Sequence, residues 1–90
     1  MTKLRDYPNI GKEVEKQLNA VGIYTMEQLK KVGAEQAWLK IKKKDHSACL
    51  HRLLALEGAI RGIKKSLIDT ERKNELKNFS KLNEVLDLEK

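Results

Sequence analysis

The spacing of its glycines limits what this chain can fold into more than any other feature of the sequence. Three of them divide the first third of the chain at intervals of eleven residues, at Gly11, Gly22 and Gly33. Between them, apolar residues recur at intervals of three and four, which is typical of one face of a helix. No alternation of apolar and polar residues predicts a strand. The sequence therefore predicts short helices that end at glycines.

We expect five helices of modest length, joined by short loops. The second has a clear start, because Thr25 and Gln28 have the spacing of a capping box, in which both side chains bond the first turn's backbone. The helices are expected at about residues 12–21, 25–32, 34–43, 48–64 and from Asp69 or Thr70 onward. The fold class is therefore all-α, a compact orthogonal bundle of about five short helices in a single domain over residues 1–90.

The predicted core is mainly aliphatic, and we expect Trp38 to pack in it or at its edge. Along the fourth helix runs a strip of small residues that a neighbouring helix could approach closely: Ala55, Gly58, Ala59 and Gly62. The last helix is expected to turn four apolar residues inward: Leu76, Phe79, Leu82 and Leu86.

The charge of the chain permits an acidic partner such as nucleic acid. The net charge is +6, and residues 1–44 carry +5 of it. A solubility role would explain the same surplus. The single cysteine, Cys49, excludes an internal disulfide, and the sequence has neither a secretory signal nor an apolar run long enough to span a membrane. We therefore expect a cytoplasmic protein without a membrane partner.

The segment Tyr7-Pro8-Asn9-Ile10-Gly11-Lys12 opens directly into an amphipathic helix and resembles the hairpin of helix-hairpin-helix domains. Free N–H groups at a helix N-terminus and a close backbone approach at glycine suit a DNA phosphate, bound without base specificity. The candidate contacts are Asn9, Ile10, Gly11, Lys12 and Lys16. Glu13 and Glu15 oppose this reading, because acidic residues in the first turn repel a phosphate. The alternative is a hairpin that only packs.

A second basic cluster follows in the third predicted helix, at Lys40, Lys42, Lys43 and Lys44. These lysines could contact phosphates in a salt-sensitive way. They could equally form a solvated helix end, where lysines complement the helix dipole.

No pattern in the sequence predicts catalysis. Glu57 is expected to be a structural carboxylate that accepts hydrogen bonds from loop N–H groups, Arg61 or Arg52. His46, Cys49 and His51 are close in sequence but lack a second cluster that would complete a tetrahedral metal site. We therefore predict no enzyme activity, no catalytic residue, no metal, no cofactor and no small-molecule substrate.

Taken together, the motifs resemble one family, the C-terminal domain of the TfoX/Sxy competence regulators. The resemblance covers about residues 4–79 and leaves 80–90 as the end of the last helix. It rests on Pro8 to Gly11, on Gly22-Ile23 with Thr25, on Val32 to Ala34 and on Leu53 to Gly62. Members often carry a tryptophan shortly after that last run, where this chain has Ile63-Lys64-Lys65-Ser66. The regulators join the domain to an N-terminal one, so the resemblance here is to a stand-alone domain.

The resemblance implies a small helical domain linked to DNA uptake or transcriptional regulation. Our leading expectation is a non-enzymatic interaction domain that binds DNA weakly, through backbone phosphates and without base preference. The alternative is a protein–protein docking or self-association module, with a protein partner or a homodimer formed through the small-residue strip or the last helix.

Overall fold

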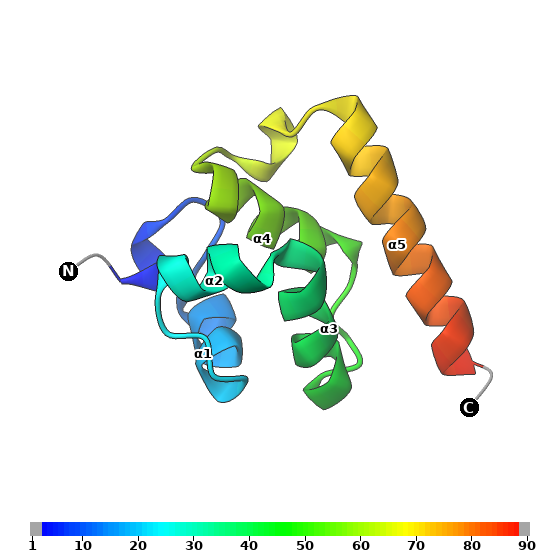
Figure 1. Ribbon diagram of the computed structural model, residues 1–90, viewed down its shortest axis with the longest axis horizontal. Helices are drawn as coiled ribbons and strands as arrows, with labels where there is room; N and C mark the ends of the chain where they lie inside the picture. The colour runs from blue at the N-terminus through cyan, green and yellow to red at the C-terminus, as the bar shows by residue number, and fades with distance from the viewer. Residues whose placement is uncertain (1–2, 89–90) are drawn as a thin grey trace.

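The computed structural model describes the backbone of residues 3–88 and the side chains of residues 3–83. Within that range the chain forms five α-helices and two short 3-10 turns, with no strand. The elements are η1 (Leu4–Asp6), α1 (Lys12–Ala20), α2 (Met26–Val32), α3 (Ala34–Lys44), α4 (Leu50–Arg61), η2 (Lys65–Leu67) and α5 (Thr70–Leu88). The predicted all-α class is confirmed. Figure 1 shows α1 to α4 gathered into one body and α5 running along its right-hand side.

The starts and ends of the early helices follow the predicted local signals. The Thr25 side chain accepts a hydrogen bond from the Gln28 backbone N–H at 3.1 Å, and Gln28 Oε1 accepts from the Thr25 N–H at 3.2 Å. This capping box opens α2 as expected. Gly33 is both the C-cap of α2 and the N-cap of α3, so a single residue connects the two helices.

The core draws on all five α-helices, of which α3 and α4 pack most extensively on each other, and Trp38 is its largest fully buried side chain. The Trp38 side chain is fully buried, its indole N–H donates to the Cys49 carbonyl at 3.1 Å, and its ring meets the Phe79 ring edge-on with centroids 6.0 Å apart. The packing role predicted for Trp38 is confirmed. The same core contains aliphatic residues from every α-helix, including Leu18, Leu29, Leu53, Leu56 and Leu76.

Two expectations for α4 are wrong. The helix runs from Leu50 to Arg61 rather than from about Ala48 to Lys64. Gly62 ends it with φ +73°, a left-handed conformation that glycine adopts without strain. Within the small-residue strip, Gly58 receives Asn9 of the hairpin and the backbone of residues 63–65 rather than a neighbouring helix, and a Cβ at Gly62 would meet nothing within 4 Å.

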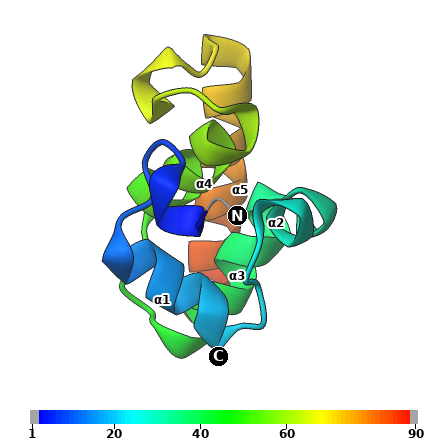
Figure 2. The same ribbon diagram turned by 90° about the vertical axis from the view of Figure 1, so that its left-hand side faces the viewer.

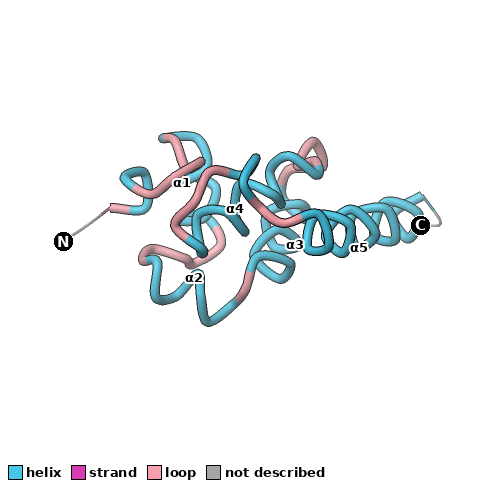
Figure 3. Tube along the Cα trace, turned by 90° about the horizontal axis from the view of Figure 1, so that it is seen from above, coloured by secondary structure: helices cyan, strands magenta, loops and turns pink. Residues whose placement is uncertain are grey.

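The inward face of α5 is also rotated from the prediction. Leu76 and Ser80 are buried and Phe79 is partly buried, but Leu82 is 60% exposed. Six residues beyond Leu76, Leu82 lies about 120° around the helix from it, so the two cannot share a face. Leu86 falls outside the residues whose side chains are described. Seen from above, α5 continues past α3 and forms one end of a molecule measuring 42 × 29 × 20 Å (Figure 3).

None of the helices within residues 3–88 combines the length and the apolar character that a bilayer crossing requires.

Candidate nucleic-acid interface

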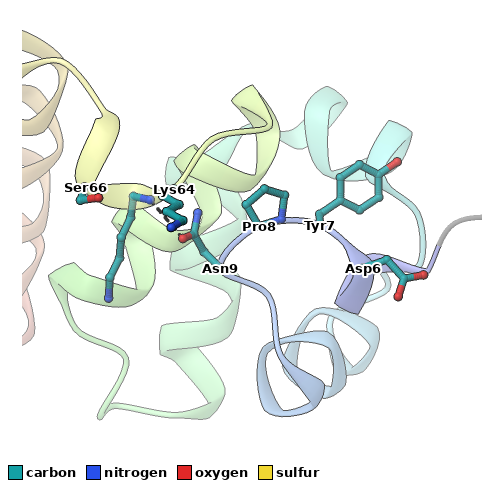
Figure 4. Close-up of a pocket in the computed structure, with 7 residues that line it drawn as sticks. Asp6, Tyr7, Pro8, Asn9, Lys64 and Ser66 are labelled. Carbon is teal, nitrogen blue, oxygen red and sulfur yellow. Dashed lines mark hydrogen bonds between the residues drawn. The ribbon is translucent and has the colours of Figure 1, made fainter.

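The hairpin between η1 and α1 is fixed to a distant part of the chain through Asn9. The Asn9 backbone has φ +68°, the left-handed conformation that asparagine tolerates better than most residues. Its side-chain amide donates to the Ile63 carbonyl at 2.9 Å, and its Oδ1 accepts from the Lys65 N–H at 3.0 Å. Figure 4 shows the Asn9 side chain directed at this loop. The hairpin therefore has a defined position relative to the end of α4.

Gly58 makes this approach possible. A Cβ atom at position 58 would lie 2.8 Å from the Ile63 carbonyl oxygen and still closer to the Asn9 amide nitrogen. Only a residue without a side chain fits there. Gly58, within the run from Leu53 to Gly62 that carries part of the family resemblance, is therefore where the hairpin packs against α4.

Beside the fixed hairpin lies an open groove of about 620 Å³. Its lining residues come from both ends of the contact: Asp6, Tyr7, Pro8, Asn9, Lys64, Lys65 and Ser66. Sequence reasoning missed Lys64 and Lys65 as site residues, and noticed Ile63 to Ser66 only as a departure from the family pattern. No local signal points from these lysines to a hairpin more than fifty residues earlier.

At the start of α1, one of the two opposing carboxylates is already engaged. Glu15 Oε2 accepts from the Arg5 backbone N–H at 3.1 Å, and its Oε1 lies 3.2 Å from Arg5 Nε. Glu13 stays exposed. Gly11 caps the helix without a side-chain hydrogen bond. Of the hairpin candidates, Ile10 is buried in the core, where it anchors the turn. The element before the hairpin is only the 3-10 turn η1, so the helix-hairpin-helix description stays a prediction.

Lysines form a row along the exposed side of α1. Lys12 and Lys16 are both exposed and lie four residues apart, on the same helix face. Lys44 of α3 continues the row, because its Nζ donates to the Ala20 carbonyl at the end of α1, at 2.9 Å. Figure 2 shows the segment around η2, the hairpin and α1 following one another on one side of the molecule. We call Lys12, Lys16 and Lys44 the α1 lysine row.

The predicted cluster of residues 40–44 does not act as one patch. Lys42 is buried, with Nζ 5.2 Å from the centre of the Trp38 ring and 3.4 Å from the Ala48 carbonyl oxygen. Lys40 instead lines a smaller groove of about 280 Å³, together with Lys31 and the loop between α1 and α2. At about 100° per residue, Lys40 and Lys44 lie on one face of α3 while Lys42 and Lys43 point away from it, so the four lysines cannot share a face.

Within residues 3–83, the ion pairs are made by arginines. Arg72 Nη2 lies 2.6 Å from Glu35 and 3.2 Å from Glu57, and Arg61 Nε lies 2.7 Å from Glu57. Burial works to raise the pKa of Glu57, but hydrogen bonds from Arg72 and then Arg61 outweigh it and hold the pKa below its usual value. The predicted contact of Glu57 with Arg61 is confirmed. Arg52 bonds Gln17 instead.

The sequence profile of the TfoX C-terminal domain matches residues 1–80. The chain belongs to the TfoX C-terminal domain family. Two curated relatives are each 32% identical to it: Protein Sxy of Escherichia coli, over 87% of this chain, and DNA transformation protein TfoX of Haemophilus influenzae, over 94%. The matches take in 37% and 38% of those proteins, so the chain spans just over a third of their length.

Solved structures share the fold of this TfoX C-terminal domain. An uncharacterized protein from Listeria monocytogenes, in a triclinic crystal form, has a TM-score of 0.91 at 43% identity and covers 92% of this chain and 94% of its own. A protein of unknown function from the same organism, in a tetragonal form, has a TM-score of 0.85 at 45% identity, with 87% and 95% covered.

The described part of this TfoX C-terminal domain contains no group of three or more His, Cys, Asp or Glu side chains that could hold a metal ion. What it does bring together is a fixed hairpin, an open groove with lysines at one end, and the α1 lysine row. Positive groups in this arrangement can bind an extended anion that contacts several of them at once.

Proposed function

We propose that this TfoX C-terminal domain is a non-catalytic DNA-binding module that contacts backbone phosphates without base preference. One relative bears the name DNA transformation protein. By that likeness we extend the proposal to a part in DNA uptake or its regulation. The proposal also assigns the domain to the cytoplasm, where the chromosome lies.

The observation that carries the proposal is the division between arginines and lysines. Arg5, Arg61 and Arg72 bind carboxylates of the same chain. Lys12 and Lys16 are exposed and make no such pair among the described residues. The fourth arginine, Arg52, is partly buried and bonds Gln17 rather than a carboxylate. The exposed positive charge that α1 leaves for a partner is lysine charge, and ammonium groups on flexible stems contact phosphates without reading bases.

The α1 lysine row has a length that fits a polyanion. Eight residues of helix separate Lys12 from Ala20, so the row spans about 12 Å at 1.5 Å per residue. Lys44 uses one of its donors on the Ala20 carbonyl, and a lysine ammonium has three. All three ammonium groups can therefore contact successive phosphates of one strand.

The test is fluorescence anisotropy of a labelled duplex titrated at about 50 mM and about 200 mM salt, the range over which phosphate contacts lose most affinity. The variant is Lys12→Gln with Lys16→Gln, and the matched control is Lys77→Gln with Lys81→Gln on α5, both exposed. Each pair removes the same charge. Because every lost phosphate contact lowers the log–log salt slope by about 0.9, we expect the α1 variant to lower it by about 2.

Two results would contradict the proposal. One is the absence of binding at the lower salt concentration. The other is an equal loss of affinity in the α1 pair and the α5 pair, which would show attraction to total charge rather than to this surface.

A docking module remains the second candidate, and the exposure of Leu82 favours it. Leu82 of α5 presents an apolar side chain to solvent at 60% exposure. Phe79 is unsuitable for testing it because it packs on Trp38. Leu82→Ser should leave the fold intact, and light scattering after size exclusion should then show a smaller mass if α5 mediates self-association.

A further inference from the structure

We propose that the groove between the hairpin and η2 binds an unpaired nucleotide, so that the domain prefers single-stranded DNA to a duplex. This inference rests on the proposed function and names its substrate class. The groove volume of about 620 Å³ lies within the range of small-ligand sites. Its two ends differ in chemistry.

One end of the groove is formed by two rings. Figure 4 shows the rings of Tyr7 and Pro8 next to each other, with Asn9 between them and the basic end. Tyr7 is partly buried against the core, which holds its ring in place. An aromatic ring at the groove suits the face of a base, which a duplex keeps stacked inside and a single strand exposes.

The other end of the groove is cationic. Lys64 and Lys65 line it and are exposed, and the Lys73 ammonium lies 3.1 Å from the carbonyl oxygen of Ser66 at its rim. These groups suit the phosphate attached to the stacked base.

The carboxylate of Asp6 determines which end of the groove suits the base and which suits the phosphate. Asp6 lies at the Tyr7 end, where it accepts from the Lys3 N–H at 3.1 Å. Its charge disfavours a phosphate beside the rings and leaves that end to the base. The hydrogen bonds of Asn9 to Ile63 and Lys65 hold the two walls at a fixed separation, so the ligand does not have to order them.

The test compares a labelled thymidine oligonucleotide of about 15 nucleotides, near the upper site size of small single-strand binders, with a duplex of the same length at the same salt. We expect the single strand to bind several-fold more tightly. Tyr7→Leu should weaken single-strand binding about tenfold and leave duplex binding unchanged, whereas Tyr7→Phe should keep both, because stacking needs the ring and not the hydroxyl. Circular dichroism melts check that each variant folds.

Surface variants keep the test decisive even if Tyr7→Leu unfolds. Lys64→Gln with Lys65→Gln should weaken single-strand binding more than the matched α5 pair Lys77→Gln with Lys81→Gln. Equal affinity for the single strand and the duplex would overturn the inference. So would competition by thymidine monophosphate as effective as that by the oligonucleotide, which would assign the groove to free nucleotides.

The outcome separates this inference from the proposed function. If the duplex binds through Lys12 and Lys16 but the single strand binds no more tightly than the duplex, the assignment of the groove is wrong and the proposed DNA-binding function is still supported. If neither DNA binds, both fail.

Discussion

Asn9 and Lys65 are joined by a 3.0 Å hydrogen bond across 56 residues of sequence, from the Lys65 backbone N–H to the Asn9 side chain. With the bond from Asn9 to the Ile63 carbonyl, it makes one side chain the connection between the hairpin and the end of α4. The surface that we assign to DNA depends on this connection, because the hairpin and Lys64 are distant in the sequence and meet only in the folded domain.

Asn9→Ala should destabilise the domain by about 2–3 kcal/mol, because it removes two hydrogen bonds and leaves a β-carbon residue at φ +68°. Asn9→Gly removes the same bonds but relaxes the backbone, so its cost should be about 1 kcal/mol smaller. Urea unfolding followed by tryptophan fluorescence measures both. Equal costs for the two variants would show that the left-handed backbone contributes nothing.

Gly58→Ala should destabilise the domain by about 1–3 kcal/mol, because the new methyl group would press on the Ile63 carbonyl and the Asn9 amide. Gly11→Ala is the control, since a Cβ at position 11 meets nothing within 4 Å and φ there is −99°. Its cost should stay below about 1 kcal/mol, the loss of a preferred N-cap residue. If Gly58→Ala were as mild as its control, the close approach would not constrain the fold.

The domain should lose stability in acid through Glu57. Its pKa is lowered in the folded protein, so its contribution is complete above the unfolded value near 4.5 and is lost as the pH falls through the folded pKa. Glu57→Gln should cost about 2 kcal/mol at pH 7, because Arg61 and Arg72 lose their shared charge partner. The difference in the free energy of unfolding between wild type and variant, measured by urea titration, should become smaller below about pH 4. A difference that does not depend on pH would mean that the charge of Glu57 contributes nothing to stability.

Substitutions of the neighbours Lys42 and Lys43 should differ in their effect on the stability of the domain. Lys42→Gln should lower stability by about 1 kcal/mol with little change in DNA affinity, because its ammonium lies over Trp38 and near the Ala48 carbonyl. Lys43→Gln should leave stability unchanged, because that side chain is exposed. Thermal melts measure the stability of both variants, and DNA anisotropy measures their affinity. A large loss of DNA affinity in Lys42→Gln alone would mean that the buried lysine turns outward on binding.

The features that were predictable from sequence are those whose cause lies within a few residues. The Thr25 capping box needs only Gln28, three positions away, and the left-handed Asn9 needs only its own side-chain chemistry. The burial of Trp38 was predictable for another reason, since a large aromatic side chain on the apolar face of a helix is usually buried.

The features that were missed depend on distant partners or on angular position. The seat that Gly58 offers to Asn9 joins two segments without a shared local pattern. Leu82 follows Phe79 by three residues, which suggested an inward position, but it lies about 120° around the helix from Leu76, and the buried stripe continues at Ser80 instead. The lysines of residues 40–44 form a cluster in sequence only, and the second half of the candidate groove comes from Lys64 and Lys65, which no motif marked.

The long span between Asn9 and Lys65 also sets an order of events during synthesis. A chain leaves the ribosome from its N-terminus, so the hairpin emerges early but finds its partners at residues 63–65 only when most of the body is already outside. Closing so long a loop comes late in any folding sequence, because its entropy cost must first be offset by contacts made nearer along the chain. A nascent domain therefore cannot complete the groove between the hairpin and η2 before residues 63–65 have emerged, and a truncated product ending before Lys65 cannot form it at all.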